Sequence, residues 1–208
     1  MIRSIKLLGL AVVSLLVIAV AASAASAANF HSENSVVEVW GASNYAGGPQ
    51  YFSLPGLGTF PCEAEFKGNV TSQNASTLSL TPTYANCRFL GLNTVASTVG
   101  CRYTYSASST AMGSVALGCS TGNKFTFNVA GCVVTIPAQT PTAPAVGYAL
   151  SGSGTSRAIQ VSLRLEGVYA SWTGAICGTG STSNATLTGP VTLYGKTSGG
   201  AKAGIWLE

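Results

Sequence analysis

Six cysteines constrain this chain more than any other feature of its sequence. They are Cys62, Cys87, Cys101, Cys119, Cys132 and Cys177. All six lie well beyond an N-terminal segment that has the character of an export signal. An even number of cysteines in an exported protein indicates a disulfide framework, because the thiols meet an oxidising compartment. The sequence therefore predicts three disulfides.

The N-terminal residues follow the plan of a secretory signal. Two basic residues precede an apolar run that ends near Ala22, and small residues continue from there to Ala28. A positive, then apolar, then small-residue order is typical of a cleaved signal peptide. We expect residues 1–27 to be the signal, with a cut after Ala28 as the alternative. An uncleaved membrane anchor is less favoured, because the apolar run falls slightly short of a bilayer span.

The remaining residues, 28–208, have the length of one domain with its own core. Without the two basic residues of the signal, eight Lys and Arg stand against six Glu, which gives a net charge near +2. That charge is too small to indicate a nucleic-acid or anionic-membrane partner. We expect a single domain that begins with a loose arm over residues 28–35. We expect no integral membrane association once the signal is removed.

Apolar and polar residues alternate with a period of two along most of this domain. In one run, for example, Leu78, Leu80 and Tyr84 fall on the same face. Further strands are expected at 36–40, 50–54, 59–66, 94–99, 101–105, 112–117, 124–129, 133–136, 146–150, 161–166, 187–193 and 204–207. No stretch after the signal shows a sustained helical period. The pattern predicts an all-β fold of about ten to twelve short antiparallel strands, arranged as a sandwich or a barrel-like sheet.

Strand direction narrows the pairing of the cysteines. If the strands between residues 78 and 136 run alternately up and down, Cys101 and Cys119 lie at one end of a hairpin. Cys87 and Cys132 then lie together at the opposite end. Because a disulfide needs Cα atoms within about 7 Å, this favours Cys101–Cys119 nested inside Cys87–Cys132, with Cys62–Cys177 remaining. A local scheme stays open, with Cys87–Cys101, Cys119–Cys132 and again Cys62–Cys177.

Residue types needed for catalysis are scarce. The chain has no Asp, and its one histidine, His31, lies in the expected arm. A nucleophile activated by a base and an orienting acid is therefore not expected. The cysteines do not form closely spaced pairs, which argues against a structural zinc site. We expect a protein that is not an enzyme, with no catalytic residue, no metal site and no cofactor.

Two narrower hypotheses remain for the charged residues. Glu63 and Glu65 are two apart on an expected strand, so their carboxylates share a face at a spacing that glycosidases use. A solvated strand face is the preferred interpretation of that pair. If the signal is cut after Ala28, His31 becomes the third residue of the mature chain and completes a square-planar Cu(II) or Ni(II) site.

Four aromatic residues allow a hypothesis of sugar binding, and three asparagines match a separate motif for glycosylation. Trp40, Tyr45, Tyr51 and Phe52 would form a platform for stacking sugar rings if they are exposed, although aromatic residues at this density more often belong to a core. Asn69, Asn74 and Asn184 each begin a glycosylation acceptor motif.

Four segments carry a resemblance to a known group. They are LTPTY at 80–84 followed by Cys87, GCRYTY at 100–105, GCVVTIPAQ at 131–139, and the closing GIWLE at 204–208. Together with FHSE at 30–33, they resemble uncharacterised exported six-cysteine β-domain proteins of soil actinobacteria. The resemblance implies a secreted, disulfide-bonded β domain and supplies no activity or ligand.

The sequence thus favours a secreted or cell-surface β domain with a structural or adhesive role, in contact with cell wall or glycans. An extracellular module that binds carbohydrate or another small ligand is the alternative. A hydrolase that uses Glu63 and Glu65 is less favoured. So is an outer-membrane barrel, because disulfides and short strands count against it.

Overall fold

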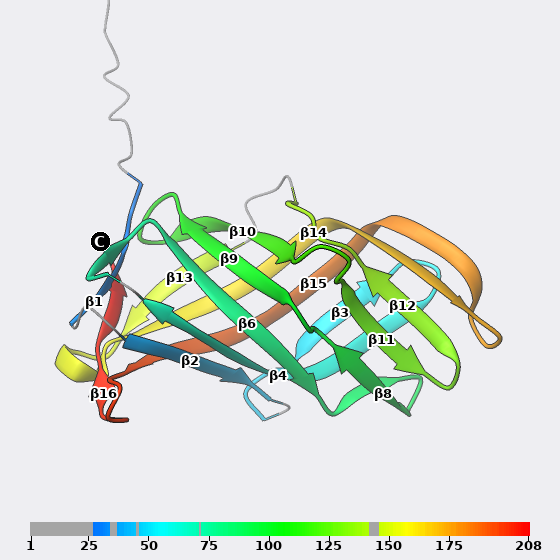
Figure 1. The fold of residues 1–208 in the computed structure, drawn as a ribbon, viewed down its shortest axis with the longest axis horizontal. Coiled ribbons are helices and arrows are strands. Elements are labelled where there is room, and N and C mark those ends of the chain that lie inside the picture. The colour runs from blue at the N-terminus through cyan, green and yellow to red at the C-terminus, as the bar shows by residue number, and fades with distance from the viewer. Residues whose placement is uncertain (1–26, 34–36, 45, 71, 142–145) are drawn as a thin grey trace, which may run out of the picture.

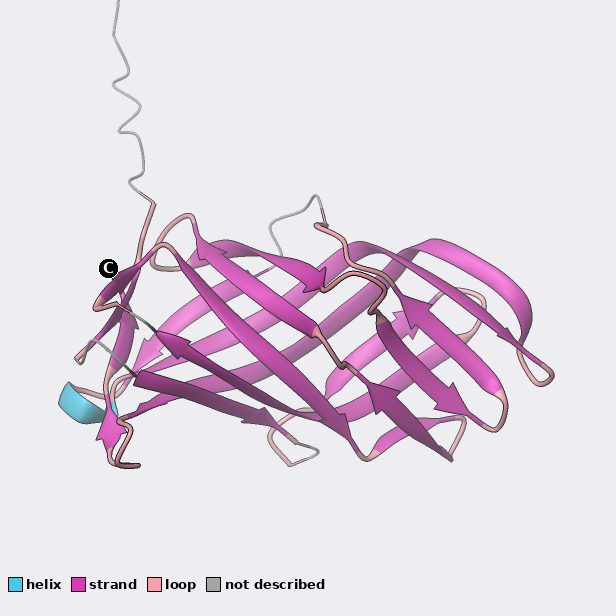
Figure 2. Cartoon of the chain, viewed as in Figure 1, coloured by secondary structure: helices cyan, strands magenta, loops and turns pink. Residues whose placement is uncertain are grey.

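A computed structural model describes residues 27–33, 37–44, 46–70, 72–141 and 146–208. Its regular elements are seventeen strands and one short 3-10 turn, η1. The all-β, antiparallel, disulfide-bonded fold expected from the period of two is confirmed (Figures 1 and 2). The strands are β1 Phe30–Ser32, β2 Val37–Ser43, β3 Gln50–Leu54, β4 Gly58–Val70, β5 Asn74–Ala75, β6 Thr77–Ala85, β7 Cys87–Phe89, β8 Leu92–Ser97, β9 Cys101–Ala107, β10 Met112–Cys119, β11 Phe125–Val129, β12 Cys132–Ile136, β13 Val146–Ser151, β14 Ala158–Gly174, β15 Gly178–Lys196, β16 Lys202–Ala203 and β17 Ile205–Leu207; η1 is Gly154–Ser156.

One half of the molecule is a closed ring of strands. The order β2, β4, β6, β9, β10, β13, β14 and β15 returns to β2, and every neighbouring pair is antiparallel. Figure 1 shows β6, β9 and β10 in front and β13, β14 and β15 behind them. The ring thus consists of two layers of strands that are joined by strand pairing at both sides. Both predicted arrangements, the sandwich and the barrel-like sheet, therefore describe part of it.

The other half continues from the long strands of the ring. β14 pairs with β13 as far as Leu163 and with β12 from Ser171 onward. β15 makes the same kind of change, since residues near Leu187 pair with β3 whereas Thr192 and later residues pair with β2. Beyond β12 the sheet continues through β11 and β8 to β7. A strand that changes partner midway is longer than expected from a local apolar run, which explains the lengths of β14 and β15.

The core follows the alternation read from the sequence. In β6, Leu78, Leu80, Pro82 and Tyr84 are buried while the intervening residues are not. The buried side chains of both halves form one continuous cluster. Aromatic rings dominate this cluster where the two halves meet. The ring centroids of Phe52 and Tyr84, for example, are 5.0 Å apart. Burial of such rings is the main favourable term in folding of a domain like this.

The disulfides correct part of the predicted pairing. Cys101 and Cys119 are bonded as expected, because they are register partners at the end of the β9–β10 hairpin. The predicted bonds Cys87–Cys132 and Cys62–Cys177 are wrong, and so is the local alternative. The other two bonds are Cys62–Cys87 and Cys132–Cys177.

The reason is that the strands do not form one meander. β10 pairs with β13, a strand from much later in the chain, so β11 and β12 fold into the other half. The β7–β8 hairpin turns back beside β4, which brings Cys87 to Cys62, with their Cα atoms 4.1 Å apart. Cys132 pairs in register with Gly174, next to the β14–β15 turn that carries Cys177.

The expected loose arm is also wrong over residues 28–33. β1 lies between β17 and β5 in a separate three-stranded sheet. Phe30 is buried and packs edge-on against Tyr148. Asn29 and Glu208 exchange two backbone hydrogen bonds, of 2.7 and 3.1 Å. The apolar Phe30 side chain therefore anchors β1 across one end of the ring. Residues 1–26 of the expected signal, and residues 34–36, lie outside the described part of the chain.

Candidate functional site

The expected carboxylate pair does lie on one strand face. Glu63 and Glu65 both line a shallow surface depression of about 370 Å³ over β2, β4 and β6. Glu65 forms an ion pair with Lys67 at 3.3 Å, and the Asn86 amide donates a hydrogen bond to Glu63. Both carboxylates thus contact polar neighbours on an open face, as solvated side chains of a strand commonly do.

His31 is held in a way that opposes the proposed copper or nickel site. Its ring stacks on Trp206 with centroids 5.6 Å apart and planes 15° from parallel. The backbone of Phe30 and His31 belongs to β1, which pairs on both sides. Chelation through backbone nitrogens would require β1 to leave its sheet. Among the described residues, no three His, Cys, Asp or Glu side chains lie close enough together to hold a metal ion.

The hypothesis of an aromatic platform fails because the fold separates its members. Phe52 is buried in the core and Tyr51 points outward from β3. Tyr45 lies outside the described residues. Trp40 instead stands directly opposite Tyr194 in the β2–β15 register. Trp40, one of the four aromatic residues named from the sequence, therefore belongs to a different surface cluster.

Trp40 and Tyr194 form the centre of that cluster. Their ring centroids are 6.2 Å apart, and the two planes are tilted by 30°. Tyr194 is 42% exposed and Trp40 is partly exposed. On the far side of Trp40, its β4 register partner is Lys67. A Tyr–Trp pair on adjacent strands of a sheet presents two outward rings on a single face.

Three cations line the same pocket as this aromatic pair. The Lys196 ammonium lies 5.1 Å from the centre of the Trp40 ring. Lys202 is the register partner of Lys196 across β15 and β16. Arg157, at the end of η1, lies over Trp206 at 4.7 Å. Cations placed over aromatic faces are attracted by the ring quadrupole, which restricts their positions. We call Trp40, Tyr194, Lys196, Lys202 and Arg157 the aromatic–basic cluster.

A pocket of about 360 Å³ opens among these side chains. Its wall on the sheet side carries Trp40, Tyr194, Lys196 and Lys202, and its other wall is Thr155, Ser156 and Arg157. A second pocket of about 320 Å³ adjoins it, with Arg157 in both walls and with Trp206 and Glu208 in its own. The two pockets adjoin at Arg157, at the end of the molecule where Figure 2 shows the cyan 3-10 turn beside the C-terminal segment.

Local turns position the cations. The β15–β16 hairpin closes through bonds from the Thr197 amide to Ala201 and from the Gly200 amide to Thr197. Gly200 has a φ of +82°, a conformation that favours glycine. This turn sets Lys202 opposite Lys196. The backbone carbonyl of Arg157 accepts a bond from Ile205, which fixes the end of η1 against β17.

Sequence reasoning missed Tyr194, Lys196, Lys202, Arg157 and Trp206. They come from separate segments, and only the register between β2 and β15 brings Trp40 to Tyr194. One local signal was present. The stretch KTSGGAK at 196–202 has lysines at both ends of a Ser-Gly-Gly turn, which is a hairpin pattern with two like charges facing each other.

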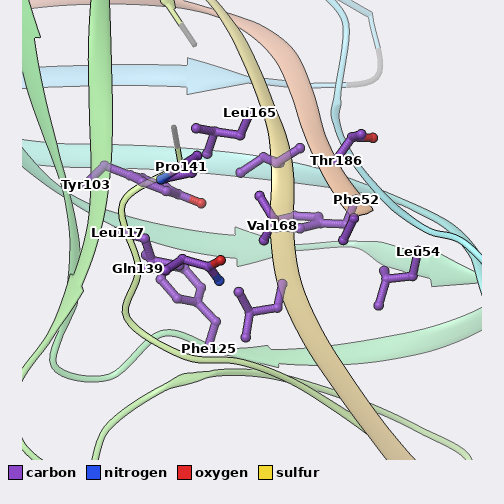
Figure 3. A pocket seen from close by; sticks show the side chains of 13 residues that line it. Phe52, Leu54, Tyr103, Leu117, Phe125, Gln139, Pro141, Leu165, Val168 and Thr186 are labelled. Atoms are coloured by element: carbon purple, nitrogen blue, oxygen red, sulfur yellow. The ribbon is translucent and has the colours of Figure 1, made fainter. Parts of the chain in front are cut away.

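A cavity in the core is too small to hold a ligand. It lies where the two halves join and is lined mainly by apolar side chains, with Gln139 and Thr186 as polar members (Figure 3). Its volume of about 10 Å³ is close to the space for one water molecule. Burial raises the pKa of Tyr103, which lines it, and those of Tyr84 and Tyr105 nearby. These tyrosines are therefore neutral members of the core.

Comparison of the chain with protein-family models, with curated proteins and with solved structures finds no match. Within the described residues, no helix has the length and apolar character needed to cross a membrane.

Proposed function

We propose that the protein is an exported, non-enzymatic adhesive domain that binds carbohydrate at the aromatic–basic cluster. The observation that carries this proposal is the pair Trp40 and Tyr194, which stand side by side on the outer face of the sheet above an open pocket. Sugar rings have apolar C–H faces that pack on aromatic rings, and their hydroxyls need polar groups at the edge of the contact. This surface supplies both.

Export is the second part of the proposal. Three disulfides among six cysteines are typical of proteins that fold in an oxidising compartment. The N-terminal pattern of a secretory signal agrees with this, and so does the resemblance to exported six-cysteine β-domain proteins of actinobacteria. A rigid, cross-linked scaffold suits a domain that holds one binding face outside the cell. Its partner would then be a cell-wall or other extracellular glycan.

We propose a non-enzymatic role because Glu63 and Glu65, the best catalytic candidates, are not arranged as a catalytic pair. Glu65 is paired with Lys67, and Glu63 accepts a bond from Asn86 on an open strand face. A glycosidase needs one carboxyl group held as an acid and a second on the opposite side of the bond to be cleaved. Two carboxylates on the same strand face do not flank a substrate in that way.

The test is retention of the mature protein on insoluble and soluble polysaccharides. We expect Trp40→Ala and Tyr194→Ala each to weaken binding by roughly tenfold, the effect of losing one good stacking contact. Tyr51→Ala is the matched control, because Tyr51 is 41% exposed but lies on β3, away from the cluster. The proposal fails if no polysaccharide is retained, or if Tyr51→Ala weakens binding as much as Tyr194→Ala does.

A further inference from the structure

We infer that the carbohydrate bound at the aromatic–basic cluster is acidic, a polysaccharide whose sugars carry carboxylate or sulfate groups. This inference rests on the proposed function, because it names the class of sugar that the same face binds. The charged group would lie in the pocket of about 360 Å³, and a sugar ring would stack on Trp40 and Tyr194 at its wall.

The wall of this pocket is positively charged. Of the residues that line it, Arg157, Lys196 and Lys202 are cationic and none is acidic. These are three of the eight Lys and Arg that follow the expected signal. Thr155 and Ser156 add hydroxyls that can donate to an anion. A pocket that gathers three cations and no carboxylate is complementary to a negatively charged group.

Two of these cations lie directly opposite each other on adjacent strands. Lys196 and Lys202 occupy directly paired positions of the β15–β16 hairpin, so their side chains leave the same face of adjacent strands. Like charges at such positions destabilise a sheet. A local arrangement that works against stability is expected where a site serves binding. An anion bound beside both lysines would offset their repulsion, which Glu38, the β2 register partner of Lys196, does only on the other side of β15.

Two of the three cations are held in position in the free protein. Lys196 lies on the Trp40 ring and Arg157 lies on the Trp206 ring. Because these contacts restrict long side chains, less rotamer entropy is lost when an anion binds. Trp40 and Tyr194 line the same pocket as these cations, so the charged group and the sugar ring would be bound side by side.

The acidic residues nearby define the limits of the site. Glu38 is the β2 register partner of Lys196 but does not line the pocket. Glu208 lines the adjoining pocket, where it accepts a bond from the Trp206 indole at 3.1 Å. Glu33 accepts a bond from the Gly204 backbone. We therefore place the charged group in the first pocket and a neutral part of the polymer in the second.

The experiment compares four soluble polymers with the mature protein by titration. Polygalacturonate carries carboxylates, dextran sulfate carries sulfates, dextran is neutral, and polyphosphate is an anion without sugars. We expect both acidic polysaccharides to bind at least about tenfold more tightly than dextran, with affinity falling from about 0.05 to about 0.5 M NaCl as charges are screened. Separate carboxylate and sulfate arms identify which substituent is preferred.

Variants locate the effect in the pocket. Lys196→Gln and Lys202→Gln should each weaken binding of the acidic polysaccharide by roughly tenfold, the effect of losing a charge-assisted contact. Lys124→Gln, at an exposed lysine before β11, is the control and should leave affinity unchanged. In the free protein, Lys202→Gln should raise the melting temperature, because it removes the positive charge that lies opposite Lys196. A lower melting temperature would show that Lys202 has a structural role, and it would count against the site.

The outcomes separate the two proposals. If dextran binds as tightly as the acidic polymers, the inference is overturned while the carbohydrate-binding function stands. If polyphosphate binds as tightly as the acidic polysaccharides and Tyr194→Ala changes neither, the pocket is a general anion site and the inference is again overturned. If no polysaccharide binds at all, the proposed function itself fails.

Discussion

The side-chain amide of Gln139 pairs with the backbone of Tyr169 as a strand residue would. The Tyr169 amide donates to Gln139 Oε1 at 2.7 Å, and Gln139 Nε2 donates to the Tyr169 carbonyl at 2.9 Å. The backbone of Gln139 pairs at the same time with Leu117 of β10. Along β14, the pairing with β13 ends at Leu163 and the pairing with β12 begins at Ser171. Gln139 links β10 to β14 in the interval between these two pairings.

Replacement of Gln139 should weaken this junction. We expect Gln139→Ala to lower the free energy of unfolding by about 1 kcal/mol, because the exposed Tyr169 amide and carbonyl exchange these two bonds for bonds to water. Urea denaturation measures the loss, and hydrogen exchange should show faster exchange at the Tyr169 amide. Gln160→Ala, at an exposed glutamine of the same strand, is the control. Equal stability of the two variants would show that Gln139 does not stabilise the junction between β10 and β14.

The disulfides should differ in their contribution to stability. In the chain-entropy model, a bond that closes a longer loop constrains the unfolded chain more. Removal of Cys132–Cys177, which spans 45 residues, should therefore cost about 4 kcal/mol, and removal of Cys101–Cys119, which spans 18, about 3 kcal/mol. Paired Cys→Ser variants compared in urea provide the measurement. The reverse order would mean that strain or residual structure outweighs loop entropy here.

Two buried tyrosines should respond oppositely to loss of the hydroxyl. Within the described residues, the Tyr105 hydroxyl is buried without a hydrogen-bond partner, whereas Tyr84 and Tyr103 share a bond of 2.9 Å. Tyr105→Phe should raise the free energy of unfolding by about 1 kcal/mol, because no unsatisfied group remains. Tyr103→Phe should lower it by a similar amount, because the Tyr84 hydroxyl loses its partner. Thermal melts of the two variants decide the point, and stabilisation by Tyr103→Phe would contradict it.

The alternation of single strands was readable from the sequence, and their long-range pairing was not. The runs at β6, β9 and β11 bury the residues that their patterns predicted, because a period of two follows from backbone geometry alone. Whether β10 pairs with β11 or with the later β13 depends on the whole sheet. The choice of partner for β10 decides two of the three disulfides. The site also depends on long-range pairing, because Trp40 meets Tyr194 only through the register of β2 on β15.

Alkaline pH should unfold the protein through its buried tyrosines. Burial raises the pKa of Tyr103 and of Tyr105, and for Tyr84 the charge of Tyr103 adds to the effect of burial. Above the unfolded pKa of about 10, the unfolded chain has released phenolic protons that the folded state still holds, so stability falls as pH rises. Each buried tyrosine contributes a slope of about 1.4 kcal/mol per pH unit in that range. Urea midpoints should stay level with respect to these groups below about pH 9 and fall steeply above about pH 10. Tyr105→Phe should make the decline shallower, and an unchanged slope in that variant would show that Tyr105 ionises as readily in the folded protein as in the unfolded chain.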